Sequence, residues 1–359
     1  STATTSAARA HREVCRLRHL IQLPINRCTI VLLYPISQRH DNRRRNALTG
    51  SVCSVMVQRV ISAPDSTGRS SPPWTWRAVA DLIRLDNQSG TWLLLLPSLW
   101  ALVLANQGRP PMKLIVLFIL GAFVMRSLGV VFNDLADRNF DKHVVRTSNR
   151  PLAAGRLAPR QALLVALGLA IFAAGLVSTL NWFTVLLSPI ALFLAAVYPF
   201  CKRWIHIPQA VLGIAFGWGA IMAWAASRGT IAPAAWWLFA ATTCWAVAYD
   251  TIYALQDRED DLRIGVKSSA LLFGTAVPVA VGLFLLGMLV CLIIVGQLSG
   301  LGMGYYAALT LPAGIFLWQA RRLRFPVTPP QAFTMFQQHV LAGVVILITL
   351  WISTWNEVP

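Results

Sequence analysis

Long apolar windows constrain the fold of this chain more than any other feature of its sequence. A helix rises 1.5 Å per residue, so about 20 apolar residues cross the ~30 Å hydrocarbon layer of a bilayer. Hydrophobic residues form 56% of the chain, more than an ordinary soluble domain contains. We therefore predict an all-α membrane protein with nine transmembrane helices. The windows centre on residues 91–105, 114–132, 162–180, 182–200, 208–226, 235–254, 270–295, 302–320 and 340–355.

Residues 1–70 differ in composition from the rest of the chain. They contain eleven Arg, no Lys and three acidic residues. A stretch rich in Ser, Thr and Arg fits an organellar transit peptide, and it also fits sequence read through upstream of a true start at Met56. We interpret residues 1–70 as a disordered or non-core N-terminal extension, and residues 71–359 as the membrane domain.

Basic residues in the short loops predict the orientation of the helices. The loops after the second, fourth, sixth and eighth windows contain 14 Lys and Arg, whereas the opposite loops contain only Arg109, Lys113 and Arg228. Loops rich in Lys and Arg stay in the cytoplasm. We therefore expect the N-terminus inside, the C-terminus outside, and both acidic clusters of the chain on the cytoplasmic face.

Acidic residues are rare in the membrane domain, and eight of its eleven lie in two clusters at the ends of apolar windows. The members that recur at four-residue steps are Asn133, Asp137 and Asp141 in the first cluster, and Asp257 and Asp261 in the second. On a helix, this spacing places each set along one face. Like charges there repel unless a cation lies between them, and oxygen ligands favour a hard ion such as Mg²⁺. The alternative is a solvated acidic helix end.

Basic and phenolic side chains accompany the acids. Arg126 lies seven residues, about two helical turns, before Asn133, so it faces the same way. Others lie in the following loop or near the end of the fourth window: Arg146, Arg150, Tyr198 and Lys202. Carboxylates that bind Mg²⁺, ringed by such groups, make a site for a diphosphate. Because an apolar bundle beneath would hold a hydrocarbon tail, we predict a lipid diphosphate as the ligand.

Three motifs carry a resemblance to a known family. They are Asn-Asp-x-x-Asp-x-x-x-Asp at 133–141, Tyr-Pro-x-x-Lys-Arg at 198–203, and Asp-Thr-x-Tyr-Ala-x-x-Asp-x-x-Asp-Asp at 250–261. Together they resemble the UbiA superfamily of intramembrane aromatic prenyltransferases. Residues 146–155 and 264–268 look like its 4-hydroxybenzoate polyprenyltransferase branch.

The resemblance implies a fold, a reaction and a set of residues. The fold is a nine-helix bundle around a central cavity. The reaction is Mg²⁺-dependent transfer of a polyprenyl group from polyprenyl diphosphate to the carbon ortho to the hydroxyl of 4-hydroxybenzoate, in ubiquinone synthesis. The catalytic residues, which would also bind the metal, are Asp137, Asp141, Asp257 and Asp261, with Asn133 as a further metal ligand. The substrate-binding residues would be Arg126, Arg146, Arg150, Tyr198 and Lys202 as diphosphate contacts, together with Asn133 and Tyr253.

Arg84 is the candidate for binding the carboxylate of the aromatic acid. It precedes the first window on the cytoplasmic side and has no acidic cluster of its own in sequence. Arg is the side chain best shaped to hold a carboxylate by two parallel hydrogen bonds. The competing interpretation is an interfacial residue that only sets topology, and the sequence leaves both open.

Rival functions also remain open at this stage. Relatives within the superfamily act on homogentisate, dihydroxynaphthoate, haem or chlorophyllide. A divalent-cation transporter would place its carboxylates near the middle of the bilayer, on broken helices. The expected partners are the two substrates and the lipid bilayer, with no nucleic acid. The expected location is a bacterial inner membrane or, if residues 1–70 are a transit peptide, the mitochondrial inner membrane.

Overall fold

The computed structural model describes residues 74–144 and 146–356, and no strand occurs among them. The predicted N-terminal extension, residues 1–70, lies outside these residues, and so does Met56, the possible true start of the protein. The long helices are α4 (Ser89–Ala105), α5 (Met112–Asp137), α6 (Pro159–Ser178), α7 (Trp182–Trp204), α8 (Pro208–Arg228), α9 (Pro233–Ala254), α12 (Val277–Leu298), α14 (Thr310–Arg322) and α15 (Pro329–Asn356). The short ones are α3 (Trp76–Leu82), α10 (Arg258–Ile264), α11 (Ser269–Phe273) and α13 (Met303–Ala308), with 3₁₀ turns η1 (Asp141–His143) and η2 (Gly274–Ala276).

All nine predicted windows lie mainly on helices, but two are broken. The eighth divides into α13 and α14, because the ring of Pro312 cannot fit against the carbonyl of Ala308, where α13 ends. The seventh is interrupted at Gly274, whose φ is 52°. By length and composition, six helices of the described chain could cross a membrane, and α4 is a shorter apolar helix. The count of nine transmembrane helices therefore stays a prediction.

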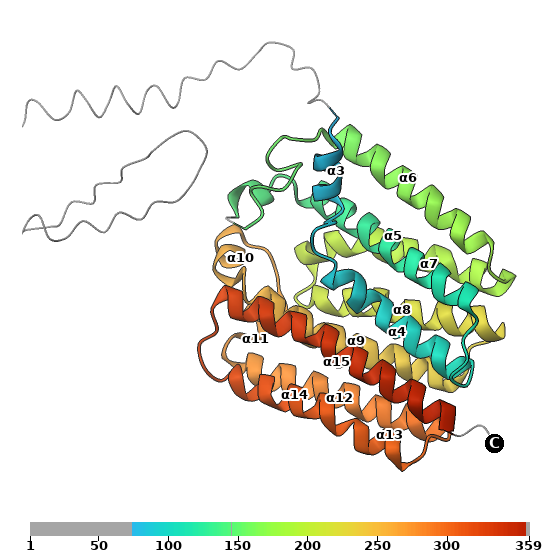
Figure 1. The fold of residues 1–359 in the computed structure, drawn as a ribbon. Helices are drawn as coiled ribbons and strands as arrows, with labels where there is room; N and C mark the ends of the chain where they lie inside the picture. The colour runs from blue at the N-terminus through green and yellow to red at the C-terminus, as the bar shows by residue number, and fades with distance from the viewer. Residues whose placement is uncertain (1–73, 145, 357–359) are drawn as a thin grey trace, which may run out of the picture. The chain divides into compact units, whose positions relative to one another are not determined.

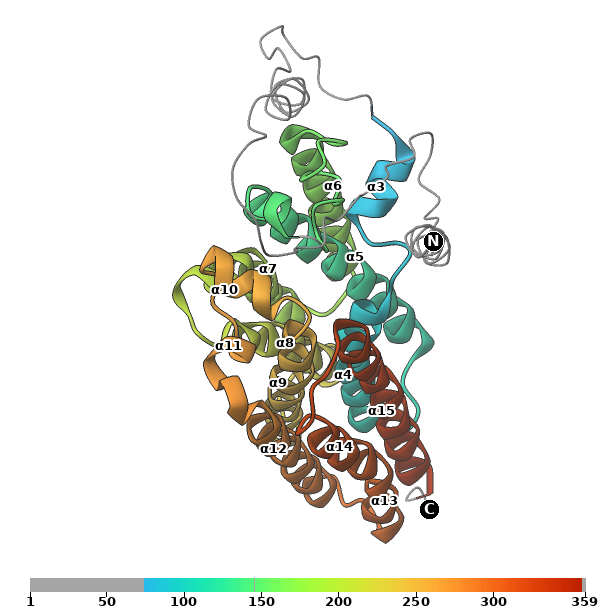
Figure 2. The same cartoon turned by 90° about the vertical axis from the view of Figure 1, so that its left-hand side faces the viewer.

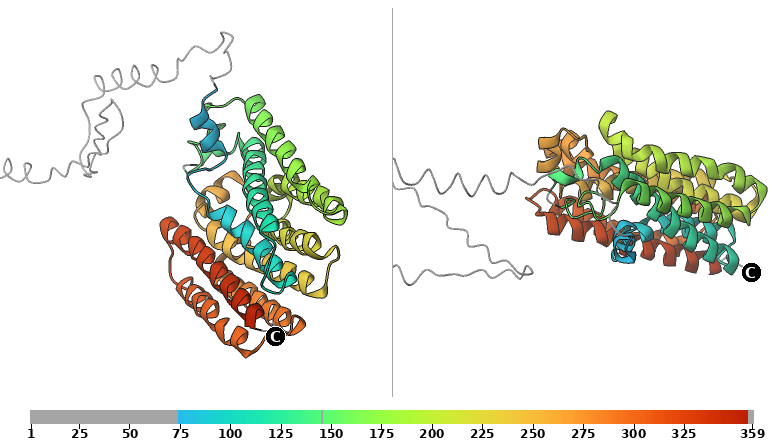
Figure 3. Two further views of the ribbon diagram at one scale, coloured as in Figure 1. Left: turned by 45° about the vertical axis from the view of Figure 1, so that its right-hand side comes forward. Right: turned by 90° about the horizontal axis from the view of Figure 1, so that it is seen from above.

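The long helices run side by side, with α6 at one edge and α14 at the other (Figures 1, 2 and 3). Helix α9 packs against α8 and α12, while α4 packs against α5, α8 and α15. In α6 and α7 only 11% of the apolar window is buried, against 44% in α8 and α15. The helices around α9 therefore form the core, and α6 and α7 expose most of their apolar surface.

Glycines on α8 allow its close approach to α9. A Cβ on Gly213 would lie 2.8 Å from the carbonyl oxygen of Thr243, and one on Gly217 would lie 2.9 Å from that of Phe239. Small residues four apart let membrane helices pack at short distance. The spacing Gly213 to Gly217 thus brings α9, which carries the second acidic cluster at its end, firmly against α8.

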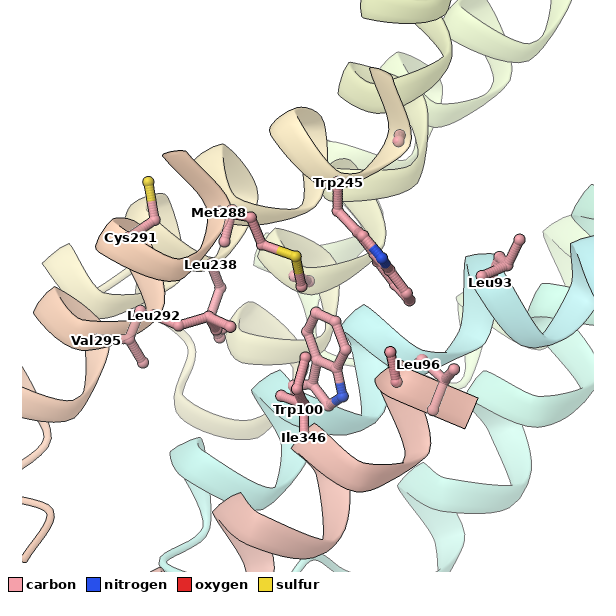
Figure 4. Close-up of a cluster of buried hydrophobic side chains, with 14 of the residues drawn as sticks. Leu93, Leu96, Trp100, Leu238, Trp245, Met288, Cys291, Leu292, Val295 and Ile346 are labelled. Carbon is pink, nitrogen blue, oxygen red and sulfur yellow. The ribbon is translucent and has the colours of Figure 1, made fainter. Parts of the chain in front are cut away.

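Two tryptophans fill the centre of the core (Figure 4). The rings of Trp100 on α4 and Trp245 on α9 have centroids 5.1 Å apart. The Trp100 indole N–H donates to the carbonyl of Gly343, 3.0 Å away, and the Trp245 indole N–H donates to Nδ1 of His339 at 2.9 Å. Since these bonds satisfy buried donors, α4, α9 and α15 are held together by polar as well as apolar contacts.

Candidate active site

A cavity of about 810 Å³ links the ends of α5, α7 and α9 to the apolar interior. On α5 its lining extends from Leu117 to Asp134, about 25 Å along the helix. Its inner part is apolar and includes Ala173 of α6 and Leu192 of α7. Ten of the twelve predicted site residues line it: Arg84, Arg126, Asn133, Arg146, Arg150, Tyr198, Lys202, Tyr253, Asp257 and Asp261.

The first acidic cluster is divided between a helix and a turn. Asp137 is the last residue of α5, and Asp141 begins η1, so the single helix face predicted for them ends at Asp137. Nζ of Lys202 lies 3.2 Å from Asn133 Oδ1 and 3.5 Å from Asp137 Oδ2. The carboxylate of Asp141 instead accepts a hydrogen bond from Arg150 Nη1 at 2.9 Å. Asp137 and Asp141 thus lie behind two basic residues that line the cavity.

The second cluster retains its predicted spacing in a helical turn. Asp257 is the N-cap of α10, and its carbonyl accepts a hydrogen bond from the N–H of Asp261 at 2.8 Å. Burial, and then the charge of Asp257, raise the pKa of Asp261 to about 6, while the charge of Lys202 and the hydroxyl of Ser268 oppose the shift. Burial likewise raises the pKa of Asp141, which Arg150 partly offsets. Negative charge at both clusters is therefore destabilised unless cations lie near it.

Arg146, in the loop that follows the first cluster, binds the second cluster. Its Nε donates to Asp257 Oδ1 at 2.7 Å, and its Nη2 donates to the other oxygen of the same carboxylate. Its Nη1 donates to the Tyr253 hydroxyl at 3.0 Å, and the guanidinium lies 5.3 Å from the centre of that ring. The loop after α5 is thereby bound to the end of α9.

The donor set fits Mg²⁺ shared with a phosphate ligand. Among the described residues, no three His, Cys, Asp or Glu side chains converge to hold a metal ion by themselves. Mg²⁺ does not need such a cage, because it binds one or two carboxylates together with waters and substrate phosphates. Asp257 and Asp261 offer only oxygen donors, and both line the cavity.

Asp134 is a buried acid that spacing did not single out. Its side chain is 1% exposed and accepts hydrogen bonds from Arg84 Nη2 at 2.9 and 2.8 Å, while Arg150 Nη1 lies 3.2 Å away. The Nη1 of Arg84 also donates to the carbonyl of Asp81 at 2.7 Å. The guanidinium of Arg84 is therefore engaged at both ends, and its binding of a substrate carboxylate stays a prediction.

A second layer of polar residues lies deeper in the cavity. Arg126 lies seven residues, about 10 Å, inward of Asn133 on α5, and Asp250 lies in the last two turns of α9, seven residues before Asp257. Arg126 interacts electrostatically with Asp250 and Tyr253, yet no group in the described part of the chain accepts a hydrogen bond from its guanidinium. Asp250 was not among the predicted site residues, although it is the first residue of the third motif, and the motif could have indicated it.

The chain is similar to known proteins over most of its length. The sequence model of the UbiA prenyltransferase family matches residues 94–342. A protein of Vibrio cholerae serotype O1 named 4-hydroxybenzoate octaprenyltransferase is 46% identical over 279 residues, which cover 78% of this chain and 98% of that protein. A protein of Nitrosococcus oceani with the same name is 49% identical over 267 residues, covering 74% and 93%.

Solved structures show the same fold. A UbiA homologue from Aeropyrum pernix K1 in its apo form has a TM-score of 0.62 at 23% identity, covering 72% of this chain and 97% of that one. A UbiA homologue from Archaeoglobus fulgidus bound to GPP and Mg²⁺ has a TM-score of 0.56 at 17% identity, covering 77% and 99%. Helix arrangement, motifs and sequence identity agree, and the chain belongs to the UbiA prenyltransferase family.

Proposed function

We propose that this protein transfers a polyprenyl group from polyprenyl diphosphate to the ring carbon ortho to the hydroxyl of 4-hydroxybenzoate, in ubiquinone synthesis. The names of relatives that are 46–49% identical over most of their length support the acceptor and the reaction. One observation carries the proposal: a single cavity joins a layer of acids and bases to an apolar channel. A lipid diphosphate has that same division into a charged head and a hydrocarbon tail.

The outer, charged layer would bind the diphosphate. Asp257 and Asp261, with Asn133 and Asp137 of α5, would hold Mg²⁺, which would neutralise phosphate charge and stabilise the departing diphosphate. Asp141, predicted as a further ligand, instead pairs with Arg150. The basic residues that now face the carboxylates would bind phosphate oxygens by charge-assisted hydrogen bonds. These residues are Arg146, Arg150 and Lys202.

The inner layer would bind the aromatic acid. The guanidinium of Arg126 has no hydrogen-bonded partner among the described residues, whereas Asp134 binds that of Arg84. Arg126, which the motifs predicted as a diphosphate contact, is therefore the cation more available to the carboxylate of the acceptor. Tyr253 and Phe336, whose ring centroids lie 4.8 Å apart, also line the cavity and supply aromatic surface against which an acceptor ring can pack.

The reaction breaks the bond between the first prenyl carbon and the diphosphate oxygen, forms a carbon–carbon bond to the ring, and releases the ring proton. Arg146 and Lys202 would stabilise the negative charge that develops on the diphosphate. Apolar side chains deeper in the cavity would exclude water from the allylic cation. Asp250 is the carboxylate of the inner layer that would accept the released proton.

We infer that the protein resides in a bacterial inner membrane, with this cavity open to the cytoplasm. Its apolar helices and its bacterial relatives support the membrane. The excess of Lys and Arg in the loops at the polar end of the cavity supports the orientation. The proposed cofactor is Mg²⁺.

The proposed function is tested with membranes from a host that expresses the full chain and lacks this activity itself. Incubation with 4-hydroxybenzoate, octaprenyl diphosphate and Mg²⁺ should yield an acid heavier by one octaprenyl group minus a hydrogen, detected by mass spectrometry. Chelation of divalent ions should abolish the product, and added Mg²⁺ should restore it. Prenylation of homogentisate or dihydroxynaphthoate in place of 4-hydroxybenzoate would contradict the proposed acceptor.

A further inference from the structure

Arg126 lies against the first turn of α4, at a residue without a side chain. A Cβ built on Gly90 would lie 2.8 Å from Nη2 and 2.9 Å from Cζ of Arg126, and closer still to its Nε. Non-bonded heavy atoms pack best at about 3.5–4.0 Å. The guanidinium of Arg126 therefore occupies space that any other side chain at position 90 would need.

The backbone at position 90 does not itself require glycine. Glycines of the described chain with positive φ include Gly229 and Gly265, but Gly90 is not among them. Gly90 belongs to α4, and Ala favours a helix more than Gly does. The three atoms nearest to the built Cβ all belong to Arg126. The structural reason for glycine at this position is therefore the guanidinium of Arg126.

The position of the Arg126 guanidinium depends on its contact with the first turn of α4. Its interactions with Tyr253, Tyr198 and Asp250 are electrostatic, and within the described ranges no acceptor forms a hydrogen bond with it. A long side chain with many rotamers is not fixed in direction by electrostatic attraction alone. Both Gly90 and Arg126 line the cavity. The contact between the Arg126 guanidinium and α4 therefore fixes the position of its positive charge within the cavity.

We propose that Gly90 is a positioning residue for the aromatic acceptor. By lacking a side chain, it lets the guanidinium of Arg126 lie against α4, where the carboxylate of the acceptor binds. This inference rests on the proposed role of Arg126 and adds a determinant of acceptor affinity that touches neither the metal ligands nor the diphosphate. A side chain at position 90 displaces the guanidinium and weakens binding of the acid selectively.

The test compares Gly90→Ala with wild type in the full-length protein, purified in detergent. We expect the KM for 4-hydroxybenzoate to rise about tenfold or more, as for a displaced charge-assisted contact. The KM for prenyl diphosphate should stay within about twofold, and the midpoint of thermal unfolding should not fall. If turnover is too slow to measure, calorimetric binding of 4-hydroxybenzoate gives the same comparison. The matched control is Gly168→Ala on α6, where a built Cβ meets nothing within 4 Å.

A double-mutant cycle distinguishes positioning from general damage. In an Arg126→Ala background no guanidinium remains to be displaced, so adding Gly90→Ala should not raise the KM for the acid further. Full additivity, or a KM for the acid within about twofold of wild type in Gly90→Ala alone, overturns the inference. If Arg126→Ala leaves that KM unchanged, the proposed role of Arg126 fails with it. Wild-type turnover of 4-hydroxybenzoate tests the proposed function independently of every variant.

Discussion

Among single residues, two acids of one cluster have different surroundings. Asp257 lines the cavity and binds Arg146, whereas Asp260 is absent from the lining and pairs with Arg263 at 3.7 Å. Asp257→Asn should lower turnover ~100-fold or more, because it removes several kcal/mol of transition-state stabilisation. Asp137 is also absent from the lining, but it pairs with Lys202, which lines the cavity, so Asp137→Asn should do the same. Asp260→Asn should keep turnover within about threefold, measured as initial rates with saturating substrates and Mg²⁺. Equal losses at Asp257 and Asp260 would indicate a general effect of negative charge.

Two arginines that line the cavity, Arg84 and Arg126, predict different phenotypes. Arg84→Ala should lower the free energy of unfolding by about 1–3 kcal/mol, because buried Asp134 loses one of its two basic partners. It should raise the KM for 4-hydroxybenzoate less than Arg126→Ala does. Thermal unfolding in detergent and steady-state kinetics with each substrate measure the two effects. A selective rise in that KM for Arg84→Ala at unchanged stability would instead assign the carboxylate to Arg84.

Spacing in the sequence predicted which acids belong to the site but not how they are paired. The four-residue step between Asp257 and Asp261 is a local property of a helical turn, and the structure retains it. The partner of Asp257 is Arg146, 111 residues away, and that pair depends on how the loop after α5 folds back. Asp134 was missed because its importance comes from burial between two arginines, which no spacing encodes.

At the scale of elements, α5 carries one continuous face of the cavity. Gly121 lies on that face, 12 residues or about 18 Å inward of Asn133, and a Cβ built on it meets nothing within 4 Å. Gly121→Phe should therefore fill the channel for the prenyl tail. We expect the ratio of kcat/KM for octaprenyl diphosphate to that for geranyl diphosphate to fall about tenfold or more. Gly175→Phe on α6, outside the cavity lining, is the matched control. An unchanged ratio would mean that the tail leaves the cavity before Gly121.

The lengths of the apolar windows predicted the helices well. In lipid or in an apolar core, about 20 consecutive apolar residues can satisfy their backbone hydrogen bonds only within a helix. The positions of proline residues predicted the ends of helices less well. Pro97 and Pro189 lie inside α4 and α7 without ending them, whereas Pro312 follows directly after a break. Whether a proline bends or ends a helix depends on its neighbours in space, which the sequence does not give.

At the scale of the whole molecule, the site forms because alternate helices end on the same side. The polar motifs close α5, α7 and α9, the second, fourth and sixth windows, and the antiparallel run of consecutive helices brings these ends together. Topology therefore sufficed to predict that the acids and bases meet. It could not predict the depth of the cavity or its inner layer at Arg126 and Asp250, since both depend on how closely α4, α5 and α9 pack.

The N-terminal boundary of the functional unit can be tested by truncation. A chain that starts at Met56 keeps every described helix and every predicted site residue. Its prenyl transfer in isolated membranes should stay within about twofold of the full chain, per amount of inserted protein. A matched chain that starts at Gln88 with an added Met lacks α3 and the bond from Arg84 to Asp134. It leaves the buried carboxylate with Arg150 alone, so it should unfold at lower temperature and lose activity. If the Met56 chain inserts normally but does not turn over, the preceding residues contribute to the site.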